Sequence, residues 1–404
     1  MTQINDSRRY DIDWLRSLAF ILLIFYHIGQ FYVLDWDWHV KSAYQSEFLQ
    51  NIMLLVNQWR MPLIFLVSGA ALSLVEPKIS AWKLFKLRSV RVFIPLVIGM
   101  YLIVPPQLYY QLIQNNGFNG DYLEFFSFYV DVNTDMYPEQ HSPIGLLTWN
   151  HLWYLPYLFS YTLIYILIKP LLSKINWSSF ASNISPWTIF LAPVSLFTLY
   201  AMLLEPKFPV THALIGDWYN HAYSFTAFLF GFLIAKSPFI WQTIIRNHKV
   251  WLGLAIVSYC LIVIRFNRVL GFDIDYNEAS SITQILIHLI WRANTVLWLL
   301  AVIGFSGAYL NKKNRILTYM NEAVLPWYIL HQTVIIVVAM NLAKYSLGGV
   351  VEPIIVTLST FAVCFVGYEL IKRNKITRFI FGMKLSKRQQ KNSNLEENIP
   401  ASVI

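Results

Sequence analysis

The chain has 404 residues, of which 56% are hydrophobic and only 13% are charged, and its formal net charge is +9. A soluble globular domain carries about 25% charged residues, so this composition excludes an ordinary soluble domain and indicates that lipid is the solvent. Aromatic residues make up 17% of the chain, which is typical of proteins whose rings line membrane interfaces. Both cysteines, Cys260 and Cys364, lie in apolar stretches. We therefore expect buried thiols, and nothing argues for a disulfide framework or a thiolate metal site.

Ten stretches are long and apolar enough to cross a bilayer, which takes about 20 residues. Backbone hydrogen bonds in lipid are satisfied within helices, so the predicted fold class is all-α, a polytopic membrane protein with about ten transmembrane helices. The first apolar run follows a polar N-terminus and is too long for a signal peptide core, so we expect it to stay as the first span. The stretches are 12–34, 52–75, 91–112, 151–173, 186–204, 222–241, 250–266, 283–310, 318–343 and 351–371.

The segments between these spans alternate in positive charge. With both termini in the cytoplasm, the cytoplasmic segments hold most of the Lys and Arg, whereas the 113–150 loop on the outside has five acidic residues and no Lys or Arg. The positive-inside rule therefore predicts both termini in the cytoplasm. The membrane domain is predicted at 1–383, and the polar tail at 384–404 is expected to be disordered. The net charge is attributed to topology and to anionic lipid headgroups, not to nucleic acid.

Arg16 and His27 are ionisable residues in the first apolar stretch, and such groups are candidates for function because they are expensive in lipid. They are eleven residues apart, which places them on one helix face, about 16 Å apart along the axis. Asp13, one turn before Arg16, can form an ion pair with it. His27 is therefore predicted near the middle of the membrane, with Arg16 at its cytoplasmic surface.

Four further ionisable residues fall near the middle of other spans, namely Arg60, His288, Arg292 and His331. These residues belong to three spans, and the span of His27 is a fourth. Four helices then offer polar groups at one depth, which predicts an aqueous cavity that holds a polar ligand. The structural alternative for each histidine is a buried ring that is hydrogen-bonded to a neighbour.

Arg88 and Arg91 form a basic cluster on the cytoplasmic side. They are three residues apart and are expected to share a helix face. Forked guanidinium groups at a helix start suit phosphate groups. The alternative is the ordinary positive flank of a membrane span.

Four motifs, in this order, resemble those of acyltransferase family 3, a family of integral membrane acyltransferases. They are Arg16 followed by ten residues and His27, Phe65-Leu-Val-Ser68-Gly69, Arg88-Ser-Val-Arg91, and His151-Leu-Trp153-Tyr154-Leu155. The WRMPLIFLVSG and HLWYL stretches look most similar to the branch that succinylates osmoregulated periplasmic glucans. The resemblance covers about residues 8–380. It implies an enzyme of the bacterial inner membrane that moves an acyl group from cytoplasmic acyl-CoA to a carbohydrate hydroxyl, on the far side of the membrane.

The resemblance also implies roles for single residues. His27 would be the catalytic histidine with Arg16 as its partner, and Asp13 is grouped with them. Arg88 and Arg91 would contact the phosphates of CoA, which is then a co-substrate, so we expect no tightly bound cofactor and no metal. The predicted substrate-binding residues are Arg60, Ser68, His151, Trp153, His288, Arg292 and His331.

The chemistry leaves several alternatives open. A neutral imidazole is suited to take the proton from a sugar hydroxyl, but His27 could also carry the acyl group itself in a two-step reaction. Acetyl and succinyl groups are both open, and a succinyl tail would favour a cation such as Arg60 or Arg292. A secondary transporter of a polar or anionic small molecule is the alternative function, although no paired broken helices indicate an inverted repeat. Monomer and homo-oligomer remain open. Asp35, Asp37 and His39 are expected in a solvated outer loop, with contact to the acceptor as the alternative.

Overall fold

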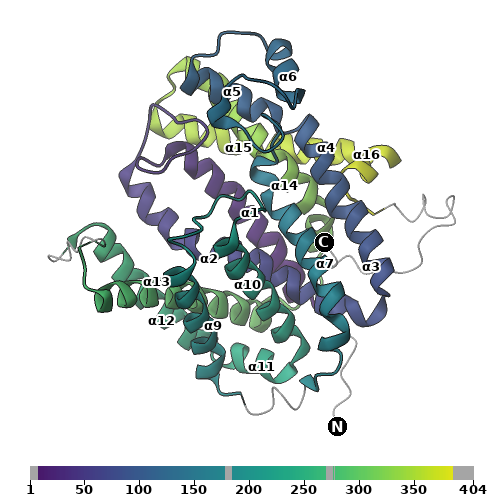
Figure 1. Ribbon diagram of the computed structural model, residues 1–404, viewed down its shortest axis with the longest axis vertical. Coiled ribbons are helices and arrows are strands. Elements are labelled where there is room, and N and C mark those ends of the chain that lie inside the picture. The colour runs from purple at the N-terminus through teal and green to yellow at the C-terminus, as the bar shows by residue number, and fades with distance from the viewer. Residues whose placement is uncertain (1–7, 178–183, 270–275, 277, 385–404) are drawn as a thin grey trace.

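The computed structural model describes residues 8–177, 184–269, 276 and 278–384. Within these residues the regular structure is helical, and β-pairing is limited to two isolated bridges, Val33 with Ser46 and Ser142 with Gly145. The all-α prediction is therefore confirmed (Figure 1). Of the tail that was expected to be disordered, residues 385–404 lie outside the described residues.

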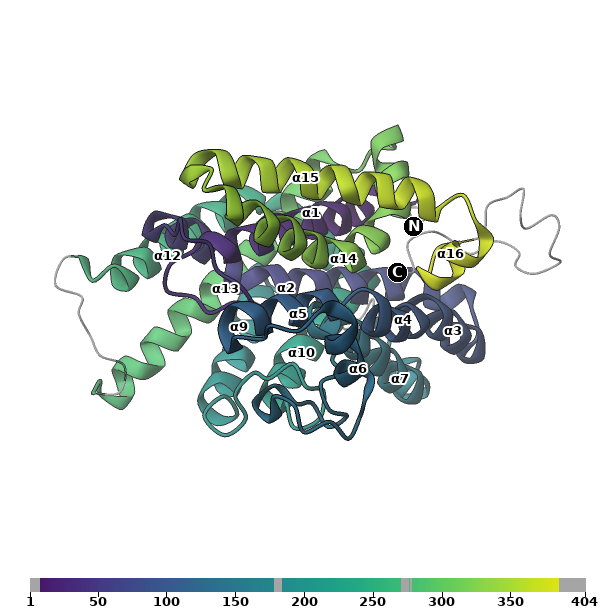
Figure 2. The same cartoon turned by 90° about the horizontal axis from the view of Figure 1, so that it is seen from above.

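The long helices form the body of the protein (Figures 1 and 2). They are α1 (Tyr10–Tyr32), α2 (Glu47–Val75), α7 (Tyr154–Leu172), α9 (Pro186–Leu203), α10 (Trp218–Lys236), α12 (His248–Phe266), α13 (Ser281–Tyr309), α14 (Arg315–Leu342) and α15 (Gly348–Ile371). The shorter α-helices are α3 (Ala81–Arg88), α4 (Ile94–Leu102), α5 (Pro105–Asn116), α6 (Tyr122–Val130), α11 (Pro238–Arg246) and α16 (Lys375–Ile380). Single turns are η1 (Glu76–Lys78), the π-helical η2 (Ser89–Phe93), η3 (Pro138–Gln140), η4 (Asn150–Trp153) and η6 (Ala343–Tyr345).

Eight helices in the described residues are individually long and apolar enough to span a membrane, and the number rises to ten if two bent pairs each count as one span. The first pair bends by 40° between Leu102 and Pro105, and the second by 98° between Lys236 and Pro238. Proline has no N–H to continue a helical ladder and is favoured at the first position of a new helix. These bent pairs correspond to the predicted spans 91–112 and 222–241, so the chain is a multi-pass membrane protein.

Helix α2 lies at the centre of the packing, between α1 and α10. It approaches α10 so closely that a Cβ on Gly69 would lie 1.8 Å from the carbonyl oxygen of Phe228, and one on Gly231 would lie 1.8 Å from that of Leu66. Only glycine permits such a crossing. The Ser68-Gly69 motif thus has a structural role, because it brings α10 against the helix that carries Arg60 and Ser68.

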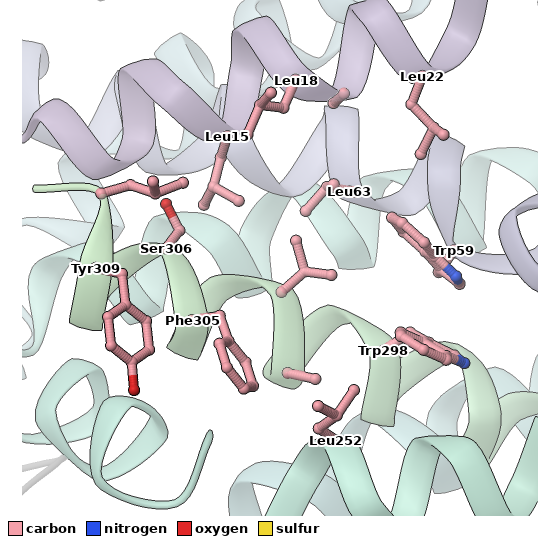
Figure 3. Close-up of a pocket in the computed structure, with 14 residues that line it drawn as sticks. Leu15, Leu18, Leu22, Trp59, Leu63, Leu252, Trp298, Phe305, Ser306 and Tyr309 are labelled. Carbon is pink, nitrogen blue, oxygen red and sulfur yellow. The ribbon is translucent and has the colours of Figure 1, made fainter. Parts of the chain in front are cut away.

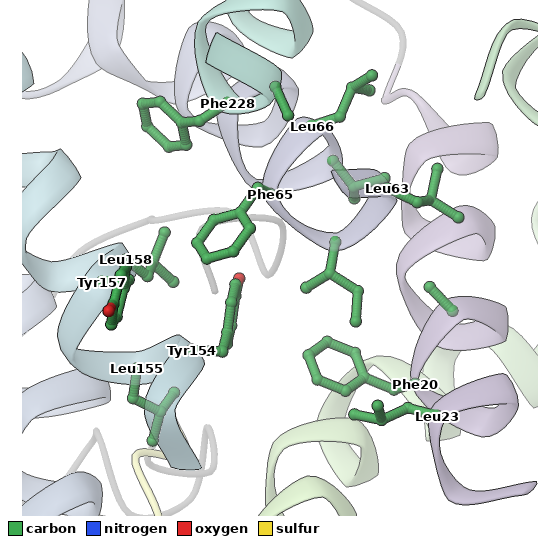
Figure 4. Packing of buried hydrophobic residues seen from close by; sticks show 14 of the residues in the cluster. Phe20, Leu23, Leu63, Phe65, Leu66, Tyr154, Leu155, Tyr157, Leu158 and Phe228 are labelled. Atoms are coloured by element: carbon green, nitrogen blue, oxygen red, sulfur yellow. The ribbon is translucent and has the colours of Figure 1, made fainter. Parts of the chain in front are cut away.

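Four aromatic side chains, which we call the aromatic septum, fill the interior between α1, α2, α7 and α14. The septum consists of Phe20, Phe65, Tyr154 and Tyr328, and all four are buried. Ring centroids are 5.1 Å apart for Phe20 and Tyr328, and 5.0 Å apart for Phe65 and Tyr154. Figure 4 shows three of these rings converging from α1, α2 and α7. Along α1 the septum residue Phe20 lies between Arg16 and His27. Along α14 the septum residue Tyr328 lies between Asn321, which contacts Arg16, and His331.

Candidate functional site

Helix α1 carries the first polar group at its N-terminal end. Nη2 of Arg16 donates a hydrogen bond to Oδ1 of Asn321 at 2.8 Å and lies 3.7 Å from Oδ1 of Asp13. Arg8 also binds Asp13, with Nη2 2.8 Å from Oδ2. Arg16 and Asp13 are both buried. Because Asp13 is shared between two arginines, this end of α1 keeps a net positive charge.

His27, further along α1, contacts His331 of α14. Nδ1 of His27 lies 2.7 Å from Nε2 of His331, and the two ring planes are nearly parallel, at 9° to each other, with centroids 5.0 Å apart. The two residues are 304 positions apart in sequence. The packing of α1 against α14 therefore creates this contact.

The hydrogen-bond network assigns the tautomer of both rings. Nδ1 of His331 lies 2.7 Å from the carbonyl oxygen of Tyr328, and a carbonyl can only accept, so this nitrogen carries the hydrogen. A neutral His331 then accepts at Nε2, and Nδ1–H of His27 is the donor. The lone pair of neutral His27 is therefore on Nε2, the atom that remains for a ligand.

His151 joins the same group from η4. Its Nε2–H donates to the carbonyl oxygen of Ile329 at 3.0 Å, so its Nδ1 accepts from Nε2 of Gln107 at 3.1 Å. Oε1 of Gln107 accepts in turn from Nε2 of Gln332 at 3.0 Å. The His151 and His331 rings meet edge to face with centroids 5.3 Å apart. In each hydrogen bond of the three histidines, one donor thus meets one acceptor.

A cavity of about 980 Å³ opens beside His27, at the end of the protein that holds α5, α6 and the 205–217 loop. We call it the outer cavity, because residues of the 113–150 loop, which the sequence predicts on the outside, line it. Its size is near the upper end of the range of about 300–1,000 Å³ that is typical of ligand sites. Asp37 and His39 of the segment that we expected to be a solvated loop both line this cavity, and Nδ1 of His39 lies 2.6 Å from Oε1 of Gln111. The other polar and aromatic lining residues include Trp38, Gln111, Gln140, His141, Trp149, Asn150, His151, Trp153, His212 and Gln332.

The 205–217 loop forms one wall of the outer cavity. Asp217 is fully buried and accepts hydrogen bonds from the backbone N–H groups of Thr211 and His212, each at 3.1 Å, and from the Tyr157 hydroxyl. The loop turns back at His212, where φ is +57°. The His212 ring stacks on Trp153 with centroids 4.0 Å apart. Burial lowers the pKa of His212 to about 4, so this ring is neutral at pH 7.

A second polar group lies on the other side of the septum. Arg88 and Arg91 are both buried, and Arg88 is only 1% exposed. None of the three guanidinium nitrogens of Arg88 has a hydrogen-bond partner in the described residues. Arg16 and the hydroxyl of Tyr154 lie within electrostatic range of Arg88, and that hydroxyl bonds the Ser68 hydroxyl. This is a buried concentration of positive charge, which an anion would stabilise.

The backbone at Arg88 and Arg91 differs from the regular α-helix that we predicted. The two residues are joined by the π-helical turn η2. Pro95 has no N–H to donate to the carbonyl of Arg91, which interrupts the α-helical ladder at this point. Single π-helical turns are frequent at functional sites.

Arg60 of α2 is the cation near the histidines. It is 8% exposed, its Cζ lies 3.3 Å from the centroid of the Tyr26 ring, and its Nε and Nη1 atoms have no hydrogen-bond partner in the described part of the chain. His27 and His212 both lie within its electrostatic range. The Arg60 charge is therefore buried, stacked on an aromatic ring and close to the outer cavity.

His288 and Arg292 lie elsewhere. They line a separate cavity of about 450 Å³ that shares no lining residue with the outer cavity. Nη2 of Arg292 is 3.1 Å from Oε2 of Glu205, and Nε2 of His288 is 2.7 Å from the Tyr276 hydroxyl. Of the residues that the sequence grouped at one depth, the structure brings together His27, His331 and Arg60, and it places these two apart.

Several residues of the site escaped sequence reasoning. Gln107, Gln332 and His212 are uncharged polar residues without a motif around them, and we had no signal for His212 beyond its being a histidine. Gln332 directly follows His331, and a second polar side chain next to an intramembrane histidine could have drawn attention to it. In the described residues no group of three or more His, Cys, Asp or Glu side chains is arranged to hold a metal ion.

Comparison with known proteins shows the family to which this chain is similar. The model of a family described as "Acyltransferase domain" matches residues 9–369. Among curated proteins, the glucans biosynthesis protein C of Salmonella heidelberg (strain SL476) is 24% identical over 410 residues, covering 96% of this chain and 98% of that protein. The protein of the same name from Salmonella typhimurium is 24% identical over 406 residues, covering 95% and 97%. No solved structure shows a significant match to the chain.

Proposed function

We propose a function for this chain, which belongs to the membrane acyltransferase family whose model matches residues 9–369. It transfers an acyl group from acyl-CoA to a hydroxyl of a glycan. The observation that carries the mechanism is the 2.7 Å contact between His27 and His331, which leaves Nε2 of His27 as a base beside the outer cavity. The relatives that are named for glucan biosynthesis support a carbohydrate as acceptor.

In the proposed reaction, Nε2 of His27 takes the proton of the acceptor hydroxyl while the hydroxyl oxygen attacks the thioester carbonyl. The C–O bond forms, the C–S bond breaks, and the proton passes from His27 to the departing thiolate. The products are an acyl ester and free CoA. If His27 instead carries the acyl group in a two-step reaction, the same Nε2 is the nucleophile. In both routes His331 accepts from Nδ1–H, orients the ring and stabilises its cationic form.

Arg88, Arg91 and Arg16 are the proposed contacts to CoA phosphates. The buried Arg88 has three guanidinium nitrogens without a hydrogen-bond partner among the described residues, which supports an anionic ligand, and Arg suits bidentate binding of phosphate. CoA is too large and too highly charged to cross the membrane. We therefore propose that its phosphates stay on the arginine side, in the cytoplasm, while the thioester reaches His27 through the septum. This places the outer cavity on the far side of a bacterial inner membrane.

The outer cavity is the proposed acceptor site. Its lining includes three Trp side chains, several amides and histidines, and no Lys or Arg among the described residues. Aromatic rings offer faces on which sugar rings can stack, and amides supply the few polar contacts that fix orientation. The absence of basic side chains from this lining favours a neutral glycan over an anionic one. Trp153 and His212 would form the main platform, because their stacked rings lie at the cavity wall.

Arg60 is the proposed determinant of the acyl group. Arg292 is paired with Glu205 in a separate cavity, which removes the reason to place an acyl carboxylate there. Arg60 is buried near His27, and no described carboxylate bonds it. A buried, uncompensated charge is costly, and a substrate carboxylate would offset that cost. This supports succinyl over acetyl as the transferred group.

The proposed function is tested with the full-length protein reconstituted in lipid vesicles, supplied with acetyl-CoA or succinyl-CoA and a neutral glucan oligosaccharide. We expect CoA release coupled to ester formation, and a loss of at least about 100-fold with His27→Ala, since general base catalysis contributes about 10²–10⁴-fold. His288→Ala serves as the matched control and should retain activity. Transport of the oligosaccharide without ester formation would favour the secondary transporter, and failure to bind CoA would contradict the proposal.

A further inference from the structure

An apolar groove of about 450 Å³ runs along the side of the protein away from the site, between α1, α2, α12 and α13. In Figure 3 the side chains of α1 and α13 face one another across it. It shares no lining residue with the outer cavity. Ser306, a polar residue in its wall, already donates a hydrogen bond to the carbonyl oxygen of Asp11 at 2.9 Å. The lining residues are Leu15, Leu18, Ala19, Leu22, Trp59, Leu63, Leu252, Trp298, Ala301, Val302, Phe305, Ser306, Tyr309 and Leu310.

The length of the groove matches half a bilayer. It extends from Trp298 on α13 to Leu310, the residue that follows the end of this helix, a separation of 12 residues, or about 18 Å. One leaflet contributes about 15 Å to a hydrocarbon core of about 30 Å. The Trp59 and Trp298 rings stack with centroids 6.0 Å apart and mark its inner end. Tryptophans usually lie at the membrane interfaces, so a Trp pair near mid-membrane is unusual.

The mouth of the groove is basic. Leu310 is followed by Lys312, Lys313 and Arg315, all exposed, and no acidic residue occurs between 301 and 321. The acid opposite, Asp11 at the start of α1, is buried and paired with Arg9 at 2.8 Å. Cations near a membrane surface attract anionic lipid headgroups.

We propose that this groove binds one acyl chain of an anionic phospholipid, with the chain end at the Trp59–Trp298 pair and the phosphate at Lys312 and Lys313. The apolar wall excludes a polar ligand, the length fits the chain of one leaflet, and the charge at the mouth selects an anionic headgroup. The chain packs against Leu15, Leu18 and Leu22, on the same helix that carries Arg16 and His27. A bound lipid therefore holds α1 in place from the outside, whatever reaction the site performs.

The test measures Trp fluorescence of the full-length protein in phosphatidylcholine vesicles that contain lipids with brominated acyl chains. Bromine quenches indoles at contact, and the contribution of the pair is the difference between wild type and a Trp59→Phe/Trp298→Phe double variant. Val302→Phe fills the groove. Val257→Phe is the matched control, because Val257 is 58% exposed on α12 and does not line the groove. A Lys312→Gln/Lys313→Gln variant changes only the mouth.

We expect brominated phosphatidylglycerol to quench the pair at least twofold more than brominated phosphatidylcholine at equal mole fraction, about the ratio that 0.4 kcal/mol of headgroup preference produces. Val302→Phe should abolish the quenching and Val257→Phe should not. The lysine variant should make the two headgroups equal while quenching persists. Equal quenching by both headgroups in the wild type, or quenching that survives Val302→Phe, would overturn the proposal. So would native mass spectrometry that finds an isoprenoid lipid, instead of one phosphatidylglycerol, retained by the wild type and lost from Val302→Phe.

Discussion

His27 donates its Nδ1 hydrogen to Nε2 of His331 across 2.7 Å, with the two ring planes nearly parallel, at 9° to each other. His331 in turn donates from Nδ1 to the carbonyl oxygen of Tyr328, at 2.7 Å. This chain of two hydrogen bonds sets the lone pair of His27 on Nε2. It places His331 in the position that a carboxylate holds in a Ser-His-Asp triad, behind the catalytic imidazole.

The first prediction concerns His331 as a positioning residue. His331→Leu removes the acceptor for Nδ1–H of His27, so the ring loses its orientation, and we expect kcat to fall by about 100-fold or more with KM for acyl-CoA unchanged. His331→Gln keeps an acceptor oxygen at this position and should recover part of kcat. Steady-state kinetics of both variants check this. If both lose activity equally, or if KM alone changes, His331 does not orient His27.

The second prediction concerns Arg60. Arg60→Gln removes a charge-assisted hydrogen bond to the acyl carboxylate, which is worth about 1.5–3 kcal/mol. We therefore expect the ratio of succinyl to acetyl transfer, measured as kcat/KM for each donor, to fall by about tenfold or more. Arg292→Gln is the control and should leave the ratio unchanged, because Glu205 already pairs with Arg292. Equal losses with both donors would instead assign Arg60 to the oxyanion.

The third prediction concerns the aromatic septum. Phe20→Ala opens a hole between the arginine side and the outer cavity, because Phe20 contacts both Tyr154 and Tyr328. Water can then reach the thioester, so hydrolysis of acyl-CoA should increase relative to acyl transfer. Phe25→Ala is the matched control on the same helix, since Phe25 is 49% exposed and packs against Phe361. The ratio of free acid to ester in the products measures the effect, and an unchanged ratio contradicts a sealing role.

The fourth prediction separates a CoA contact from an ordinary basic flank. Arg88→Met removes a buried charge that has no hydrogen-bond partner in the described residues. We expect KM for acyl-CoA to rise by about tenfold or more, whereas the thermal midpoint of the ligand-free protein should rise by about 2 °C or more. Lys86→Met, at the exposed surface of α3, should change neither quantity. A lower midpoint with an unchanged KM would show that Arg88 is structural.

The fifth prediction concerns pH and the 205–217 loop. Burial lowers the pKa of His212 to about 4, whereas an unperturbed histidine titrates near 6.5. As the pH falls, the open loop therefore takes up this proton at a higher pH than the closed loop does. The contribution of His212 to loop closure is complete above about pH 6.5 and is lost as the pH falls towards 4. Limited proteolysis of the loop should accelerate over this range in the wild type. His212→Gln should show no such acceleration, and a wild-type rate that is flat between pH 6.5 and 4 contradicts the assignment.

The sequence by itself determined the features that depend on local geometry. Hydrophobic stretches predict helices because the backbone in lipid must form its hydrogen bonds within its own segment. The main differences from straight spans are the bends from α4 to α5 at Pro105 and from α10 to α11 at Pro238. The positions of Arg16 and His27 on α1 followed from the fixed rise and rotation per residue. The asymmetry of charge across the predicted loops was likewise readable without a structure.

Depth in the membrane can be counted along one helix, but lateral position cannot. His331 and Arg292 were predicted at the same depth as His27, yet α14 packs against α1 and brings His331 into contact, whereas α13 holds Arg292 in another cavity. Likewise, the outer cavity depends on a loop that Asp217 holds through contacts with Tyr157, sixty residues earlier. Which helix lies beside which is decided by close crossings such as Gly69 against Phe228. These depend on the complementary shape of two surfaces at once, so only the tertiary structure could decide which polar groups meet.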